Sequence, residues 1–125
     1  MSTEKEPNYG QGKICYIEIP ADDISKSAAF FQSVFGWKIR TNNEGNTSFD
    51  DGIGEVSGTW VTGRNPTLEA GLLISIMVDD AEKTVQSISA NGGKIAQAIG
   101  KDFPEITAHF TDPAGNLWGI YQHRG

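Results

Sequence analysis

The chain has 125 residues, of which 38% are hydrophobic, and this suits one domain or two small modules that share a core. Its net charge of −6 and pI near 4.7 disfavour nucleic acid and anionic membrane surfaces as partners, because both attract Lys/Arg-rich proteins. A single cysteine excludes an intramolecular disulfide, and no apolar run approaches the roughly 20 residues of a membrane-spanning helix.

The chain begins with a polar segment, residues 1–12, that lacks the basic and apolar regions of a signal peptide. We therefore expect a flexible N-terminal tail and a cytoplasmic protein. Ile14–Pro20 follows as a predicted strand, in which alternate residues point to opposite faces. Cys15 lies in this apolar run and is expected to be a small buried core residue. The more polar face of the strand carries Tyr16 and Glu18.

A helix and three strands are predicted next. The helix is expected over Ile24–Phe35, where apolar residues recur at helical spacing. Asp23 or Ser25 can cap its first turn, and Gly36 can end it. The three strands are expected at residues 37–40, 47–49 and 55–61. A polar, turn-rich connector then runs over residues 63–70.

The second half of the chain repeats this order. A strand is expected over residues 71–78, a helix over Ala81–Ala90, and further strands at residues 94–99, 106–111 and beyond Asn116. Shifting the numbering by 57 places Asp80 on the helix-capping Asp23 and preserves the order of elements. We predict a single domain over residues 13–125 made of two similar modules, one at about 13–63 and the other at about 70–123.

The turn before the last strand, Asp112-Pro-Ala-Gly-Asn116, is the clearest local signal. Proline presets its backbone angle, Asp112 can accept a hydrogen bond from a following N–H group, and Gly115 tolerates a positive φ. Apolar residues flank the turn, so it predicts a hairpin. A shorter version, Asp50-Asp51-Gly52, occupies the matching place in the first half.

These elements carry six short motifs spread over about residues 13–122. They are Tyr16-Ile-Glu-Ile-Pro-Ala-Asp-Asp23, Ser27-Ala-Ala-Phe-Phe31, Val34-Phe-Gly-Trp37, Val78-Asp-Asp80, Gly92-Gly-Lys94 and Asp112-Pro-Ala-Gly-Asn116. Together they resemble the vicinal oxygen chelate superfamily of glyoxalase I, extradiol dioxygenases and bleomycin-resistance proteins, especially its small single-domain, glyoxalase-like bacterial members. The resemblance implies an α+β fold in which two βαβββ modules form an open, curved, eight-stranded mixed sheet. Helices would cover its outside, a pocket would open on its inner face, and the protein would form a homodimer.

The resemblance also implies where a metal ion would bind. Metal-using members take His, Glu or Gln ligands from inward positions on the first and last strands of each module. When the family's ligand positions are transferred to this sequence, they fall on Tyr16, Leu73, Gly119 and a residue within 59–61. None supplies His, Glu or Gln, and leucine and glycine have no side-chain donor at all. We therefore expect no metal at the usual site and no cofactor.

The first functional hypothesis is a metal-independent protein that binds a small organic molecule in an aromatic cavity. The residues expected to line this cavity are Tyr16, Trp60, Leu73, Met77, Leu117, Gly119 and Tyr121. No nucleic acid and no membrane is expected as a partner.

Two alternatives stay open. In the first, Glu18 and His109 form an acid–base pair or a shifted divalent-metal site, and the protein is a lyase, isomerase or dioxygenase relative. In the second, the chain is a dimeric accessory domain without catalysis. Glu18 also fits a structural role as a hydrogen-bonded carboxylate at the cavity wall, and His109 fits a solvated strand residue.

Overall fold

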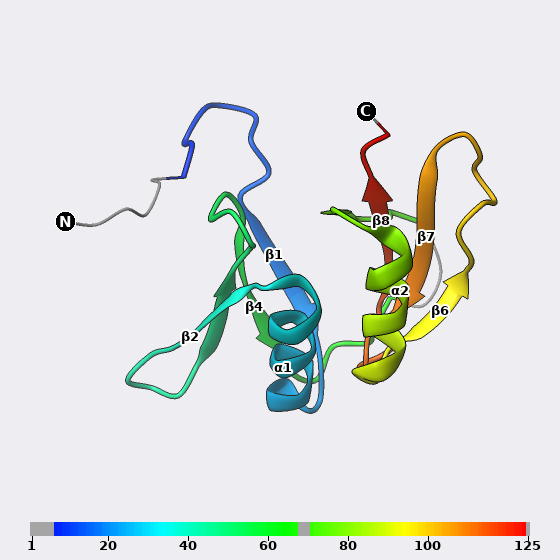
Figure 1. Cartoon of the computed structure of the whole chain (residues 1–125). Coiled ribbons are helices and arrows are strands. Elements are labelled where there is room, and N and C mark those ends of the chain that lie inside the picture. The colour runs from blue at the N-terminus through cyan, green and yellow to red at the C-terminus, as the bar shows by residue number, and fades with distance from the viewer. Residues whose placement is uncertain (1–6, 68–70, 125) are drawn as a thin grey trace. The chain divides into compact units, whose positions relative to one another are not determined.

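The computed structural model describes residues 7–67 and 71–124, and the chain divides into two compact units, Met1–Arg64 and Asn65–Gly125. Each unit has the order strand, helix, strand, strand, strand (Figure 1). The first contains β1 (Tyr16–Pro20), α1 (Ile24–Phe35), β2 (Lys38–Thr41), β3 (Thr47–Asp50) and β4 (Ser57–Val61). The second contains β5 (Ser75–Val78), α2 (Ala81–Ala90), β6 (Lys94–Gln97), β7 (Ile106–Thr111) and β8 (Leu117–Gln122).

The eight strands form two four-stranded mixed sheets with the same topology. The strand orders are β1-β4-β3-β2 and β5-β8-β7-β6. In each sheet the first strand pairs in parallel with the last, and the other neighbours are antiparallel. One helix packs against one face of each sheet and leaves the opposite face without a helix of its own unit (Figure 1). The predicted α+β fold of two βαβββ modules is confirmed.

Both helices have the predicted bounds, because local capping chemistry sets their ends. Asp23 accepts a hydrogen bond from the Lys26 N–H group at 3.0 Å, and Asp80 does the same for Lys83 at 3.1 Å. Gly36 ends α1 in the left-handed conformation, with φ of 70°, which glycine adopts without strain.

The strands begin later than the apolar runs that predict them. Pairing of β1 with β4 starts at Tyr16 opposite Ser57, and β5 starts at Ser75. Cys15 therefore precedes the regular strand, and its side chain is exposed. The prediction of a buried Cys15 is wrong, because strand alternation buries a side chain only where the strand lies against a helix.

The N-terminal segment is irregular over residues 7–15 but is joined to the β3–β4 turn through Glu55. The Glu55 carboxylate accepts a hydrogen bond from the Asn8 N–H group at 3.0 Å, and it pairs with Lys13 Nζ at 3.3 Å. The rest of the predicted tail, residues 1–6, lies outside the described residues. Over residues 7–67 and 71–124, neither helix has the length and apolar character needed to cross a bilayer.

An aromatic stack forms the core between α1 and its sheet. The Trp37 ring lies between those of Phe31 and Phe49, with centroid distances of 4.5 Å on both sides. Trp60 continues the cluster at 5.0 Å from Phe49. Phe31 and Phe49 are fully buried, so the stack removes large apolar areas from water and holds α1 against the sheet.

Candidate functional site

Each helix covers one face of its sheet. The strand register determines which residues point to the opposite face, which we call the open face. Neighbours in a register pair point to the same face. Trp60 pairs with Ile19, and both are buried on the α1 side, at 4% and 1% exposure. The prediction that Trp60 lines a cavity beside Tyr16 and Glu18 is therefore wrong. Thr59, the partner of Glu18, occupies the position that was assigned to Trp60.

The open face of the first sheet is polar. Glu18 Oε1 pairs with Arg64 Nη1 at 2.9 Å, near the end of the unit. Asp50 Oδ1 accepts hydrogen bonds from Ser57 Oγ at 2.7 Å and from Arg40 Nη2 at 3.0 Å. Tyr16, with 54% exposure, is the one residue of the predicted aromatic cavity on this face. This unit therefore presents a hydrogen-bonded, charged surface in place of an aromatic wall.

The open face of the second sheet carries the other predicted cavity residues, and we name it the second open face. Its members are Leu73, Ser75, Met77, Lys94, Gln97, Thr107, His109, Thr111, Leu117, Gly119 and Tyr121. Trp118 and Ile120 lie on the opposite, α2 side of β8, at 3% and 1% exposure, as the alternation along this strand predicts. The second open face thus brings together apolar side chains and a histidine.

Gly119 lies at the centre of the second open face, between Ser75 on β5 and His109 on β7. A Cβ atom on Gly119 would lie 2.6 Å from Ser75 Oγ and 3.5 Å from Leu73 Cδ2. Leu73 and Gly119, two of the four positions expected for metal ligands, are therefore neighbours. Neither offers a donor atom, and Ser75 fills the space into which a ligand at position 119 would begin to project. Two of the four expected positions therefore supply no side-chain ligand for a metal ion.

No three His, Cys, Asp or Glu side chains within residues 7–67 and 71–124 are grouped so that they could hold a metal ion. Glu18 and His109 belong to different units, and each is described within its own unit. Their action as a pair stays a prediction.

Some polar groups near His109 already form hydrogen bonds within the protein, and others do not. The Tyr121 hydroxyl donates to Glu105 Oε2 at 3.3 Å, and Glu105 also pairs with Arg124 at 3.4 Å. The Thr107 hydroxyl donates to Asp102. Within the described part of the chain, no hydrogen bond or ion pair engages the His109 imidazole or the Ser75 hydroxyl. His109 is half-buried and Ser75 is exposed, so both can contact a ligand.

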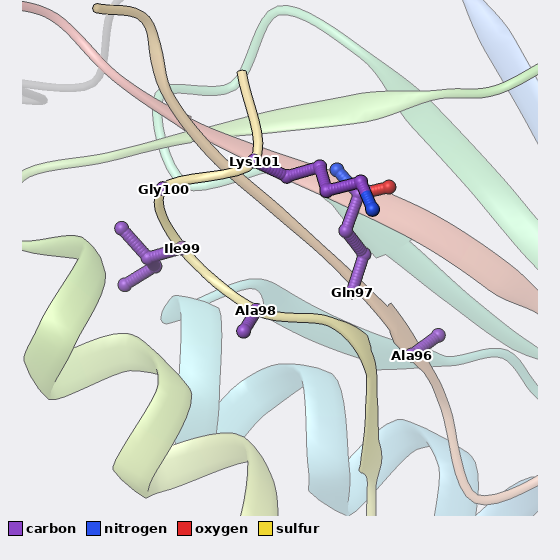
Figure 2. A pocket seen from close by; sticks show the side chains of 6 residues that line it. All are labelled: Ala96, Gln97, Ala98, Ile99, Gly100 and Lys101. Carbon is purple, nitrogen blue, oxygen red and sulfur yellow. The ribbon is translucent and has the colours of Figure 1, made fainter. Parts of the chain in front are cut away.

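A hollow of about 550 Å³ lies beside the end of β6 and is lined by Ala96, Gln97, Ala98, Ile99, Gly100 and Lys101 (Figure 2). The Gln97 and Lys101 side chains extend to one side of the segment, and Ile99 extends to the other. All six residues come from one continuous stretch, and none belongs to the predicted site. Polar groups do not converge here from several elements, as they do in most ligand sites.

Asp112 is the buried carboxylate of the second unit, at 3% exposure. Its Oδ1 accepts from the Ala114 and Asn116 N–H groups at 3.0 and 2.9 Å, and its Oδ2 accepts from Trp118 Nε1 at 3.0 Å. Burial raises the pKa of Asp112, and these hydrogen bonds oppose the rise. Because the turn and the start of β8 supply every one of these donors, the role of this carboxylate is structural.

Strand alternation in the apolar run 72–78 places Ser75 with Leu73 and Met77 on the face expected to line the cavity. One site residue escaped the prediction from sequence. Arg64, the partner of Glu18, lies in the polar connector, where no local pattern distinguishes it.

Comparisons with known proteins agree with the fold. The family model of the Glyoxalase/Bleomycin resistance protein/Dioxygenase superfamily matches residues 13–120. A glyoxylase-like domain-containing protein of Didymella fabae is 27% identical over 130 residues, which cover 91% of this chain and 96% of that protein. A hypothetical protein from S. aureus is similar in structure with a TM-score of 0.73 at 19% identity, covering 90% of this chain and 94% of the other. The fosfomycin resistance protein FosX of Mesorhizobium loti gives 0.71 at 13% identity, with 90% and 92% covered.

Proposed function

This chain belongs to the Glyoxalase/Bleomycin resistance protein/Dioxygenase superfamily, and we propose that it binds a small organic molecule at the second open face without a metal ion. The observation that carries the proposal is the contact between Leu73 and position 119. Two expected ligand positions meet there, and they present a methyl group and a bare backbone. Metal binding needs several convergent lone pairs, and this part of the sheet supplies none from those positions.

The side chains around this point favour an organic ligand. Met77 is 65% exposed, although a side chain of this size and polarity is usually buried. Tyr121 is its register partner, and Leu117 lies on the same strand face as Tyr121. Exposed apolar side chains beside a few polar groups are typical of sites for small organic molecules.

Thermal unfolding in the presence of a library of small aromatic and amphipathic compounds tests the proposal. A ligand that binds only the folded state stabilises it by RT ln(1 + L/Kd), where L is the free ligand concentration, so the midpoint rises with the logarithm of L once L exceeds the Kd. We expect stabilising compounds whose effect is the same with and without a strong chelator. Elemental analysis of the purified protein should find no stoichiometric divalent metal. Stabilisation that disappears with the chelator would overturn the proposal.

One observation supports the enzyme alternative. Within residues 7–67 and 71–124, no side chain forms a hydrogen bond or an ion pair with the His109 imidazole. Against it, the Glu18 carboxylate is already paired with Arg64 at 2.9 Å. The Glu18→Gln variant separates the two functions, with the exposed Glu44→Gln as a matched control for loss of one negative charge. The metal-independent function predicts unchanged ligand binding in both variants. Loss of bound metal and of turnover in Glu18→Gln alone would favour the enzyme.

A further inference from the structure

We propose that Ser75 and His109, on either side of Gly119, recognise the hydroxyl group of a flat, neutral aromatic alcohol. This inference rests on the proposed function, because it assigns the ligand class for the same face of the second sheet. Ser75 pairs with Gly119 in parallel register, and His109 pairs with it in antiparallel register. The three residues therefore form one row across β5, β8 and β7.

Gly119 adds no side chain of its own to the middle of this row, and Ser75 Oγ lies over it. Neighbouring strands lie about 4.8 Å apart, so the backbones at Ser75 and His109 are about 10 Å from each other. Ser75 Oγ leans over the strand between them, since it lies 2.6 Å from the point where a Cβ on Gly119 would be. With no side chain at position 119, the serine hydroxyl can lie over β8 and reach toward the His109 side of the row, so that one ligand oxygen above the sheet can meet both side chains.

The two groups complement a hydroxyl. A neutral imidazole offers one acceptor nitrogen, and a serine hydroxyl can donate one hydrogen bond. A ligand hydroxyl donates to the first and accepts from the second, so all of these hydrogen bonds are satisfied. Within residues 7–67 and 71–124, neither His109 nor Ser75 has a protein partner that would compete. The neighbouring Thr107 and Tyr121 hydroxyls already donate to carboxylates.

Apolar residues lie on both sides of this polar row. Leu73 and Leu117 precede Ser75 and Gly119 by two residues on the same face, and Met77 and Tyr121 follow them by two. On β5 and β8 the flanking side chains are apolar, whereas Thr107, Thr111 and Lys94 continue these rows on β7 and β6. The β5–β8 part of the face matches a flat hydrocarbon body that carries one polar atom. An anionic head group is disfavoured, because the row of Ser75, Gly119, His109 and Gln97 holds no lysine or arginine and the chain has a net charge of −6.

Equilibrium dialysis against 2-naphthol and naphthalene tests this assignment, because the two probes differ only in one hydroxyl group. We expect the wild-type chain to prefer 2-naphthol by about tenfold, which corresponds to two modest hydrogen bonds. Ser75→Ala and His109→Phe should each reduce that preference to about threefold or less and leave the affinity for naphthalene nearly unchanged. The matched controls are Ser33→Ala on the exposed side of α1 and His123→Phe near the chain end, and both should keep the full preference.

A readout on the wild-type chain covers the case in which a variant does not fold. In nuclear magnetic resonance spectra, 2-naphthol should shift the His109 imidazole signals and leave those of His123 in place. Equal binding of the two probes to the wild type would overturn the hydroxyl assignment and leave the proposed function standing. Retention of the full preference in both variants would overturn the hydroxyl assignment in the same way. If neither probe binds, the second open face is not a site for such molecules, and the proposed function fails with the inference.

Discussion

The Asp112 carboxylate accepts a hydrogen bond from the Trp118 indole at 3.0 Å, and both side chains are buried. The bond ties the turn before β8 to the second residue of that strand, just before Gly119. Asn116 extends the connection, because its Oδ1 accepts from the Thr67 N–H group at 3.0 Å. The residues that form the turn therefore also set the start of the strand that carries the centre of the second open face.

Replacing Trp118 by Phe should destabilise the chain more than replacing Trp60 by Phe. Both changes remove a similar volume from a buried site, at 3% and 4% exposure. The Trp118 N–H group donates to Asp112, whereas the Trp60 N–H group is buried with no hydrogen-bond partner. We expect Trp118→Phe to cost about 1 kcal/mol more in the free energy of unfolding, measured by urea titration. An equal cost would show that the indole bond contributes nothing to stability.

Asp112 should make stability depend on pH in the opposite sense to a salt-bridged carboxylate. Burial raises its pKa above the ordinary 3.8, so the folded state binds the proton more tightly than the unfolded state. The resulting stabilisation is complete below about pH 3.8 and is lost as the pH rises through the folded-state pKa. The unfolding free energy of the wild type minus that of Asp112→Asn should therefore fall as the pH rises above about 4. A rise of this quantity with pH would mean that the hydrogen bonds outweigh burial.

Local chemistry explains what the sequence predicts well. The bounds of α1 and α2 follow from a capping Asp before each helix, and the turn at Asp112 follows from its own five residues. The repeat places equivalent strands in both halves. The helix caps and the turn are each complete within a few residues of the chain, so no knowledge of distant contacts is needed to interpret them.

The side-chain direction on β4 depends instead on contacts that are distant in sequence. Trp60 is buried because β4 pairs with β1 in the register that sets Trp60 opposite Ile19, and because Phe49 packs against it. The β3–β4 turn is also one residue longer than its counterpart, since Asp51 N–H bonds to Val56 O and Asp112 N–H bonds to Asn116 O. The offset of 57 that aligns the helix caps therefore does not hold here, because the turns begin 61 residues apart (112 − 51) and end 60 apart (116 − 56). The role of Ser75 likewise depends on its register partner, Gly119, which lies on a strand far along the chain.

Gly58 should tolerate substitution much less than Gly52. A Cβ on Gly58 would collide with the carbonyl oxygen of Ile17 and with the Phe49 ring, and neither can move without disturbing β1 or the aromatic core. We expect Gly58→Ala to cost about 3 kcal/mol or more. Gly52→Ala is the control, because its Cβ would lie 3.4 Å from Phe35 O and its φ is not positive. Its effect should be within about 1 kcal/mol of zero. Similar unfolding midpoints for the two variants would contradict the packing described for β4.

Gly119 and Ser75 should show a measurable energetic coupling. Gly119→Ala places a methyl group 2.6 Å from Ser75 Oγ, so the hydroxyl must rotate or the strands must separate slightly. The cost should be about 1 kcal/mol, lower than for Gly58→Ala, because a serine hydroxyl moves more easily than a backbone carbonyl. In a Ser75→Ala background the obstacle is gone, and the same substitution should be close to neutral. A double-mutant cycle of unfolding free energies measures the coupling directly. If Gly119→Ala costs the same in both backgrounds, Ser75 does not lean over Gly119, and the reach of its hydroxyl toward the His109 side of the row is lost as an argument for ligand binding.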